Sequence, residues 1–259
     1  MMRPFAVIPM GCRILLLLAG LRLSPGTYAD SEPTDPEVGA LRSQHGCELK
    51  YEYYQPRSLV PLATLILAHG FMRDLSSQRG WAQQWLDYNI ATVVVSFCNS
   101  TVFNGHHQRN ADDLITVREH LSIESTVYAG FSAGGLASYL AALRDEAAIG
   151  YLGLDSVDSG KLAINEPAEL DVPALFMLAP ASSCNARNNI MPTIERHGYA
   201  IEVYPNARHC HFESPFDPRC GWICGKSKAD VVAVQTQIFD SATAWILATV
   251  EAERRTFNQ

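Results

Sequence analysis

A serine in a short glycine-rich motif is the residue best placed for chemistry in this sequence. Gly130, Ser132 and Gly134 form the pattern G-x-S-x-G, which follows the β-rich run Thr126–Ala129 and precedes the helical pattern Leu136–Leu143. Between a strand and a helix, this pattern places the serine on a tight turn with its hydroxyl exposed above the sheet. The motif therefore predicts that Ser132 is a nucleophile. The glycines fit because a larger side chain would collide with neighbouring backbone and because the turn needs unusual dihedral angles.

A serine hydroxyl is a weak nucleophile, so it needs an imidazole to take its proton. After a serine of this kind the chain order is serine, acid, then histidine, so the base must lie late in the chain. His197 precedes Gly198 at a predicted helix end, where a cation suits the helix dipole, and we interpret it as structural. His209 and His211 follow a predicted strand. His209 is the predicted base, and His211 is the alternative.

The imidazole in turn needs a carboxylate to fix its tautomer. The segment 179–193, which follows a late predicted strand, contains no Asp or Glu. The preceding predicted strand ends in Gly153-Leu154-Asp155, and Asp158 lies three residues further on. Asp155 is nearest to the strand end and is the predicted acid, with Asp158 as the alternative.

Backbone amides complete the expected site. The predicted strand before His69 runs into Gly70, Phe71 and Met72. A backbone N–H from such a loop, with the N–H of the residue after the nucleophile, can hold the oxyanion of a tetrahedral intermediate. The amides of Phe71 and Ala133 are therefore the predicted oxyanion hole. We interpret His69 as structural, because it precedes the serine.

The elements that must position these residues alternate between short apolar runs and helical patterns. Such alternation predicts an α/β domain with a mostly parallel sheet and helices on both faces. Runs expected to be strands covered on both faces are Leu62–Ala68, Ala91–Phe97, Thr126–Ala129, Ile149–Leu154, Ala174–Leu178 and Ala200–Tyr204. Predicted helices are Trp81–Tyr88, Ala111–Leu121, Ala133–Arg144, Met191–His197 and about Lys228–Ala252. Chemistry in such a sheet gathers outside the C-terminal ends of the strands.

The first residues are typical of an export signal. Arg13 precedes the apolar run Ile14–Leu21, and Pro25 precedes the small-x-small cleavage pattern Thr27-Tyr28-Ala29. The run is too short to span a bilayer, so no stable membrane insertion is expected. We expect a signal peptide over 1–29, a polar linker over 30–44 and a single domain over 45–259. The mature protein is predicted to be secreted or periplasmic.

Composition and charge restrict the class of partner. The 259 residues are 47% hydrophobic and 18% charged, which is the range of a folded globular domain. The formal net charge is −7, and removing residues 1–29 with their three arginines makes it −10. A nucleic-acid-binding protein needs a basic surface. No nucleic-acid partner is therefore expected.

Cysteine usage points to disulfides. The sequence has seven cysteines, and loss of Cys12 with the leader leaves an even set, which in an exported chain indicates disulfide bonds of undetermined connectivity. A zinc site is the alternative. It is disfavoured because Cys220 and Cys224 are separated by three residues and no second pair stands at the spacing of a zinc finger or ribbon. We expect no metal.

Taken together, these motifs resemble the α/β-hydrolase superfamily, and within it the group of platelet-activating-factor acetylhydrolases, chlorophyllases and cutinase-like polyester hydrolases. The resemblance rests on His69-Gly70-Phe71, the motif around Ser132, Gly153-Leu154-Asp155 and His209-x-x-Phe212, and covers roughly residues 47–250. It implies the α/β-hydrolase fold and an acid placed after the sixth strand of the family's sheet, which supports Asp155.

The function expected from the motifs and the resemblance is an exported serine hydrolase of carboxylic esters. It would use the Ser132–His209–Asp155 triad and an acyl-enzyme intermediate, with no cofactor. Small-molecule, lipid and polyester esters are all open as substrates. The alternatives are an acyltransferase, a thioesterase or a peptidase with the same triad, or an inactive binding module on this fold.

The resemblance also implies a disulfide pairing. In the family's sheet the second strand lies antiparallel beside the fourth, which would bring Cys47 and Cys98 to one end of adjacent strands. We therefore expect these two to pair. The remaining cysteines are expected to brace the loop of His209, and they are Cys184, Cys210, Cys220 and Cys224.

Overall fold

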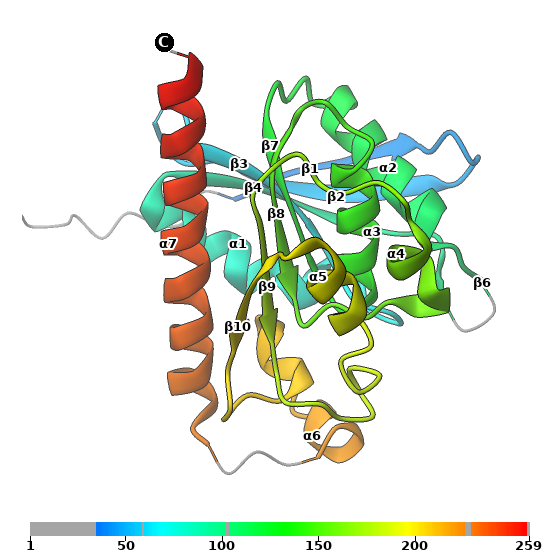
Figure 1. The fold of residues 1–259 in the computed structure, drawn as a ribbon. Coiled ribbons are helices and arrows are strands. Elements are labelled where there is room, and N and C mark those ends of the chain that lie inside the picture. The colour runs from blue at the N-terminus through cyan, green and yellow to red at the C-terminus, as the bar shows by residue number, and fades with distance from the viewer. Residues whose placement is uncertain (1–34, 59, 102–103, 226–228, 258–259) are drawn as a thin grey trace, which may run out of the picture. The chain divides into compact units, whose positions relative to one another are not determined.

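The computed structural model describes residues 35–257 apart from 59, 102–103 and 226–228. Its centre is an eight-stranded sheet (Figure 1). In sheet order the strands are β1 (Glu37–Arg42), β2 (Glu48–Tyr54), β4 (Ile90–Ser96), β3 (Ala63–Ala68), β7 (Thr126–Phe131), β8 (Ala148–Leu154), β9 (Ala174–Leu178) and β10 (Ala200–Val203). From β4 to β10 all pairs are parallel, whereas β2 is antiparallel to both β1 and β4. The mostly parallel sheet predicted from the sequence is confirmed.

Helices cover both faces of this sheet, as expected. On one face lie α1 (Arg79–Trp85) and α7 (Val231–Phe257), and on the other lie α2 (His107–His120), α3 (Ala133–Ala142) and α5 (Met191–His197) (Figure 1). Each face has its own apolar core. The structure also contains the short helices α4 (Leu162–Asn165) and α6 (Cys220–Ile223) and a two-stranded ribbon, β5 (Ser100–Thr101) and β6 (Asn104–Gly105).

The central strands are buried on both faces because their apolar residues form continuous runs. In β3, Leu65 and Leu67 belong to the core under α1 and α7, and Ile66 and Ala68 belong to the core under α2 and α3. Successive side chains of a strand point to opposite faces, so a continuous apolar run fills both cores at once. This burial fixes the register of the central strands and hence the positions of the loops that follow them.

Helix α7 packs against the sheet through one stripe. Val234, Ile238, Ala242, Ile246 and Val250 recur every four residues and are all buried, as expected for one face of a helix. Within the described residues, Val231–Thr256 is long and apolar enough to cross a membrane by length and composition, and 33% of its most apolar window is buried in the protein. The predicted helix start at Lys228 lies outside the described residues.

Two predictions about the edges of the sheet are wrong. The polar linker predicted over 30–44 contains strand β1, which pairs with β2 along its whole length. Its side chains are exposed or half-buried, so the strand lacks the continuous apolar run of a central strand. At the other edge, all of β10 is exposed, including Ile201 and Val203, although both faces were expected to be covered. Residues 30–34 and the predicted signal peptide over 1–29 lie outside the described residues.

The disulfide expected between the second and fourth strands is confirmed. Cys47 and Cys98 are bonded with their Cα atoms 6.3 Å apart. Cys47 directly precedes β2, and Cys98 lies just beyond the end of β4. The bond therefore closes the end of this antiparallel pair.

Candidate active site

Ser132 lies in the turn between β7 and α3, as the motif predicts. Its backbone has φ 55° and ψ −121°, a conformation that costs a non-glycine residue energy. Two bonds hold the turn: the Ser132 N–H donates to the Leu154 carbonyl at 3.0 Å, and the Val157 N–H donates to the Ser132 carbonyl at 3.1 Å. Both partners belong to the end of β8 and the loop after it, so the neighbouring strand fixes the backbone of Ser132.

The flanking glycines are needed for close backbone contact. A Cβ on Gly130 would lie 2.4 Å from the Gly134 carbonyl oxygen, and a Cβ on Gly134 would lie 2.3 Å from the His69 carbonyl oxygen. Steric collision, one of the two predicted reasons for these glycines, is therefore confirmed. Within the motif the positive φ belongs to Ser132 itself.

Three predicted residues from distant parts of the sequence lie in one hydrogen-bonded chain. His209 Nδ1 is 2.6 Å from Asp155 Oδ2, and His209 Nε2 is 3.0 Å from Ser132 Oγ. Since a carboxylate only accepts, Nδ1 carries the proton and Nε2 is left to accept from the serine hydroxyl. Asp155 is fully buried, and Ser132 and His209 are each 7% exposed.

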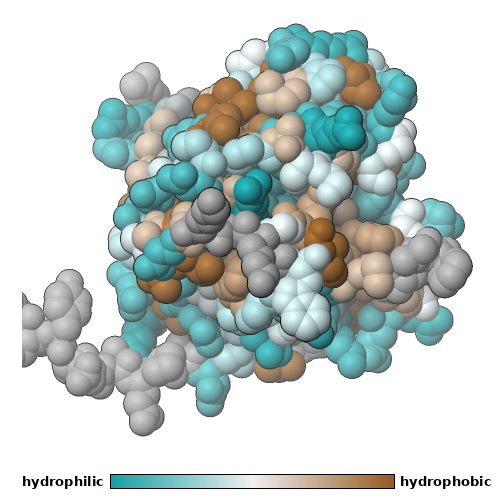
Figure 2. Space-filling view, turned by 90° about the horizontal axis from the view of Figure 1, so that it is seen from below, coloured by the Kyte–Doolittle hydropathy of each residue, from teal (hydrophilic) through white to brown (hydrophobic). Residues whose placement is uncertain are grey.

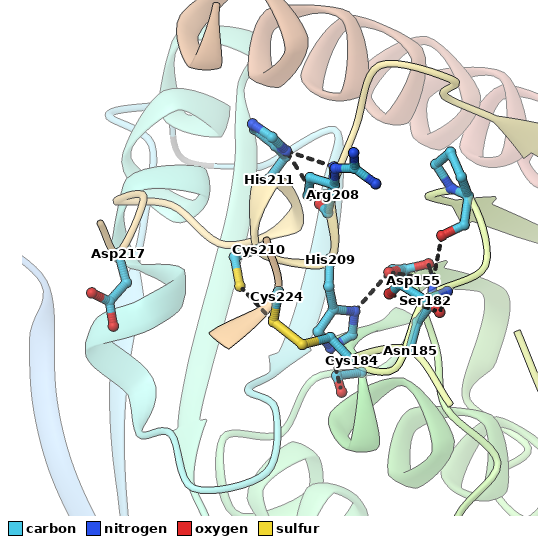
Figure 3. Close-up of a disulfide and its surroundings, with 12 residues drawn as sticks. Asp155, Ser182, Cys184, Asn185, Arg208, His209, Cys210, His211, Asp217 and Cys224 are labelled. Atoms are coloured by element: carbon cyan, nitrogen blue, oxygen red, sulfur yellow. Dashed lines mark hydrogen bonds and ion pairs between the residues drawn. A yellow bond between two sulfur atoms is a disulfide. The ribbon is translucent and has the colours of Figure 1, made fainter. Parts of the chain in front are cut away.

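The loop of His209 is a 3-10 turn, His209–Phe212, that follows β10. The His209 ring packs on Phe131, the residue before Ser132, with ring centroids 4.6 Å apart. A disulfide between Cys184 and Cys224, with Cα atoms 5.5 Å apart, lies near His209 (Figure 3). The contact with Phe131 holds the imidazole against the strand end that carries Ser132.

Cys210, the residue after the candidate base, also lies at this disulfide. It is itself disulfide-bonded, and its Sγ lies 3.7 Å from Cys224 Sγ. Three of the four cysteines expected to brace the His209 loop are therefore gathered beside it (Figure 3). The side chain of Cys220, the fourth, lies outside the described part of the protein.

The alternative residues have other partners. His211 Nδ1 accepts from the Arg208 N–H at 2.7 Å, and its ring stacks on Phe216. Burial lowers the pKa of His211. Asp158 accepts from the N–H groups of Ala163 and Ile164 at 2.9 and 3.1 Å, which caps α4. The structure thus brings His209 and Asp155, rather than His211 and Asp158, to Ser132.

The predicted oxyanion residues lie close together. Phe71 and Ala133 border the same narrow gap between side chains, together with Gly70 and Gly134. The Gly70 backbone approaches Ser132 so closely that an added Cβ would lie 3.2 Å from Ser132 Cβ. The loop that carries the Phe71 amide therefore lies beside Ser132, and the Ala133 amide belongs to the next residue of the chain.

His69 supports this loop, in keeping with the structural role expected of it. Its Nδ1–H donates to the Gly70 carbonyl at 2.7 Å, and its Nε2 accepts from the Phe97 N–H at 3.1 Å. Gly70 C=O and Phe71 N–H belong to the same peptide unit, so the imidazole holds the peptide whose N–H is the candidate oxyanion donor. Burial lowers the pKa of His69 to about 4, so the ring is neutral near pH 7.

Three candidate residues near the site were not found by sequence reasoning: Arg73, Glu213 and Asn185. Arg73 Nε donates to the fully buried Glu213 at 2.7 Å and ties the loop after β3 to the segment after His209. Burial raises the pKa of the Glu213 carboxyl, and the Arg73 guanidinium opposes that rise. Asn185, also fully buried, contacts Asp155. Arg73 and Glu213 are 140 residues apart in the sequence, and no local pattern links them.

The face that carries the site is the edge where the parallel strands end. Figure 2 looks onto this face, on which apolar and polar residues are mixed. The exposed apolar residues on it include Phe71 and Met72 of the loop after β3 and Trp222 and Ile223 of α6. Among the described residues, no group of three or more His, Cys, Asp or Glu side chains could hold a metal ion.

Comparisons with known proteins identify the fold. No protein-family model and no curated protein matches the sequence. Among solved structures, the chain is similar to the esterase domain of a Rhodothermus marinus protein, with 14% identity, a TM-score of 0.60, and coverage of 84% of this chain and 100% of that one. It is similar to a Xanthomonas campestris α/β serine hydrolase without a lid, with 16% identity, a TM-score of 0.60, and coverage of 83% and 96%. It is also similar to an α/β serine hydrolase homologue from Coxiella burnetii, with 15% identity and a TM-score of 0.54. That match covers 67% of this chain and 88% of the Coxiella chain. The chain has the α/β-hydrolase fold.

Proposed function

We propose that the protein is a serine hydrolase that cleaves carboxylic esters. The observation that carries the proposal is the buried chain of hydrogen bonds from Ser132 through His209 to Asp155. This arrangement meets the requirement for an activated serine: a base within reach of the nucleophile and a third group that orients the base. The esterase and serine hydrolases that share the fold support the same class of reaction.

In the proposed reaction, Ser132 Oγ attacks the carbonyl carbon of the ester while His209 Nε2 takes the hydroxyl proton. Asp155 stabilises the imidazolium that forms. The N–H groups of Phe71 and Ala133 hold the oxyanion, which is worth about 3–4 kcal/mol of transition-state stabilisation for one donor in a comparable site. The imidazolium then protonates the departing alkoxide, which leaves as the alcohol.

The second half of the reaction releases the acid. Water attacks the acyl group on Ser132 and gives its proton to His209, and collapse of the intermediate returns that proton to the serine oxygen. The residues of the chain supply every proton transfer in this scheme. Small-molecule, lipid and polyester esters are the proposed substrates.

A panel of p-nitrophenyl esters from acetate to palmitate tests the proposal, with a thioester and a peptide anilide of matched acyl groups alongside. Ester turnover that disappears in Ser132→Ala is the expected result. Added alcohols separate hydrolysis from acyl transfer, because a transferase gives a new ester instead of the free acid. Turnover of only the thioester or the anilide, or of no substrate, contradicts the proposal.

Export remains a proposal that rests on the composition of residues 1–29. The six cysteines beyond this segment support it, because disulfides persist in oxidising compartments. If the full-length chain is expressed in a bacterial host, the mature protein is expected outside the cytoplasm with Asp30 as its first residue. N-terminal sequencing checks this, and recovery of only uncleaved chain from the cytoplasm contradicts it.

A further inference from the structure

The loop after β9 carries asparagines where the sequence offers no acid. Asn185, Asn188 and Asn189 lie between β9 and α5. Asn188 Nδ2 donates to the Ala179 carbonyl at 3.0 Å, and Asn189 pairs with both the N–H and the C=O of Asp158 at 2.9 Å. These two side chains attach the loop to neighbouring backbone. Asn185 makes a different contact.

Asn185 faces the carboxylate of the candidate triad. Its Nδ2 lies 3.3 Å from each oxygen of Asp155 and 3.1 Å from the Pro180 carbonyl oxygen. Its Oδ1 accepts from the Ser182 N–H at 2.7 Å and from the Ser182 hydroxyl at 3.2 Å. The side chain is fully buried.

These partners fix which end of the amide meets Asp155. A backbone N–H can only donate, so the Asn185 atom that faces Ser182 must be the oxygen. The carboxylate and the Pro180 carbonyl can only accept, so the atom that faces them must be the nitrogen. A flipped amide would lose the bonds to Asp155, to the Pro180 carbonyl and to the Ser182 N–H, so the NH₂ group is held toward Asp155.

We propose that Asn185 is a positioning residue that keeps the Asp155 carboxylate aligned with His209. The Ala179 N–H donates to Asp155 Oδ1 at 2.9 Å, and Asn185 reaches both oxygens, so together they set the rotation of the carboxylate. With this rotation, Oδ2 lies toward His209 Nδ1. The catalytic consequence rests on the proposed function.

The backbone around Asn185 is held from two sides. Cys184, its neighbour, is bonded to Cys224, which lies directly after α6 (Figure 3). Ala186 and the two residues after it have positive φ, which turns the chain sharply. The disulfide thus fixes the residue next to Asn185, and the same sulfur cluster lies beside the loop of His209. The disulfide therefore lies next to Asn185 in the sequence and beside Cys210, the neighbour of His209, in space.

Two alanine variants of the same loop test this role, because the two asparagines donate to different groups. Asn185→Ala removes the donor to Asp155, whereas Asn189→Ala removes two bonds of the same loop that lead to Asp158. Asn185→Asp keeps the size and the acceptor for Ser182 but places a second carboxylate against Asp155. It serves as the second variant if Asn185→Ala folds poorly.

Asn185→Ala is expected to lower kcat for an ester by about 10- to 100-fold, the range seen when a hydrogen-bonding partner of a metal-binding side chain is removed, with a smaller change in KM. It is also expected to move the acidic limb of the pH–rate profile to higher pH, because a carboxylate with fewer donors attracts the imidazolium more strongly. Asn185→Asp is expected to lose activity as well. Asn189→Ala is expected to lower the melting temperature and to leave the acidic limb of the pH–rate profile at its wild-type pH.

Proton NMR gives a reading that is independent of activity. The low-field resonance of the His209 Nδ1–H is expected to shift in Asn185→Ala and to stay unchanged in Asn189→Ala. A resonance and a pH limb that both stay at their wild-type positions in Asn185→Ala overturn the role of Asn185. Wild-type protein that shows this resonance but turns over no ester overturns the proposed function, and the resonance in the variants still decides the role of Asn185.

Discussion

Two residues of the candidate triad are held in backbone conformations that L-amino acids seldom adopt. Ser132 has φ 55° and Asp155 has φ 47°. Each such residue costs about 1–3 kcal/mol and persists only where the surroundings determine it. Ser132 bonds to Leu154 through its N–H, and the Asp155 N–H donates to the Met177 carbonyl at 2.7 Å. The strand ends thus stabilise a geometry that the isolated turns would not keep.

The two neighbouring aspartates give a matched test of the acid. Asp155→Asn is expected to lower kcat by roughly 10⁴-fold, because the amide no longer fixes the imidazole tautomer. Asp158→Asn is expected to leave kcat within about a few-fold and to cost about 1 kcal/mol of stability, since that side chain caps α4. Steady-state kinetics and urea unfolding measure both. A larger loss of kcat in Asp158→Asn would reverse the assignment.

His69 predicts how stability depends on pH. Its pKa falls from 6.5 to about 4 on folding because the ring is buried. Between these values the unfolded chain binds the extra proton, so the free energy of unfolding decreases as pH falls, by up to about 1.4 kcal/mol per pH unit. The stability that His69 contributes is complete above its pKa in the unfolded chain. It is lost as the pH falls toward its pKa in the folded protein.

Urea unfolding at a series of pH values measures that slope. His69→Asn keeps a donor near the Gly70 carbonyl but has no titrating group, so its slope over this range is expected to be shallower than that of the wild type. Equal slopes in the two proteins would show that His69 does not titrate as described.

At the scale of elements, the strand-to-helix turns bring the site together. Ser132 follows β7, Asp155 follows β8, and the loop with Asn185 follows β9. Because parallel strands end at the same edge, residues 54 and 77 apart in sequence meet there. The close approach of α3 to β3 through Gly134 sets the distance between Ser132 and the loop after β3.

Gly134→Ala tests this approach. The new Cβ would lie 2.3 Å from the His69 carbonyl oxygen and 2.6 Å from that of Ala68, which are both backbone atoms. Strain of about 1–3 kcal/mol and a large loss of activity are expected. Gly198→Ala is the control: its φ is +68° and nothing lies within 4 Å of its Cβ. It is expected to lose about 1 kcal/mol of stability and no activity. Wild-type behaviour of Gly134→Ala would contradict the packing described.

The sequence predicted elements well where burial is complete. The bounds of β9 and α5 match the prediction, because their apolar pattern is bounded by clear breakers. Strand β1 was missed because its side chains are mostly exposed, so burial imposes no apolar run on its sequence. The candidate triad followed from the motif and the chain order. Asn185 and Glu213 could not be found in this way, because their contacts with Asp155 and Arg73 exist only after distant loops meet.

On the scale of the whole molecule, the two fully described disulfides have different positions. Cys47–Cys98 closes the β2–β4 end of the sheet, and Cys184–Cys224 lies beside His209. Their sequence separations are 51 and 40 residues. By loop entropy, each is worth about 4 kcal/mol. Similar losses of stability are therefore expected from removing either one.

Activity should separate the two disulfides. The double variant Cys47→Ser/Cys98→Ser is expected to unfold at lower urea concentration and to keep its kcat at low temperature. Cys184→Ser/Cys224→Ser is expected to lose both stability and kcat, because it releases the loop that carries Asn185. Urea unfolding and ester kinetics on each folded variant compare them. Full kcat in the second variant would show that the disulfide does not support the site.

Covalent labelling tests the central claim most directly, because it asks whether one hydroxyl among many is activated. The mature protein, treated with a fluorophosphonate and digested, is expected to carry a single adduct on the peptide that contains Ser132. Ser132→Ala is expected to keep its melting temperature and to take no label, and His209→Ala to be labelled far more slowly. A labelled Ser132→Ala protein, or a wild-type protein whose Ser132 stays unmodified, would contradict the assignment of the nucleophile.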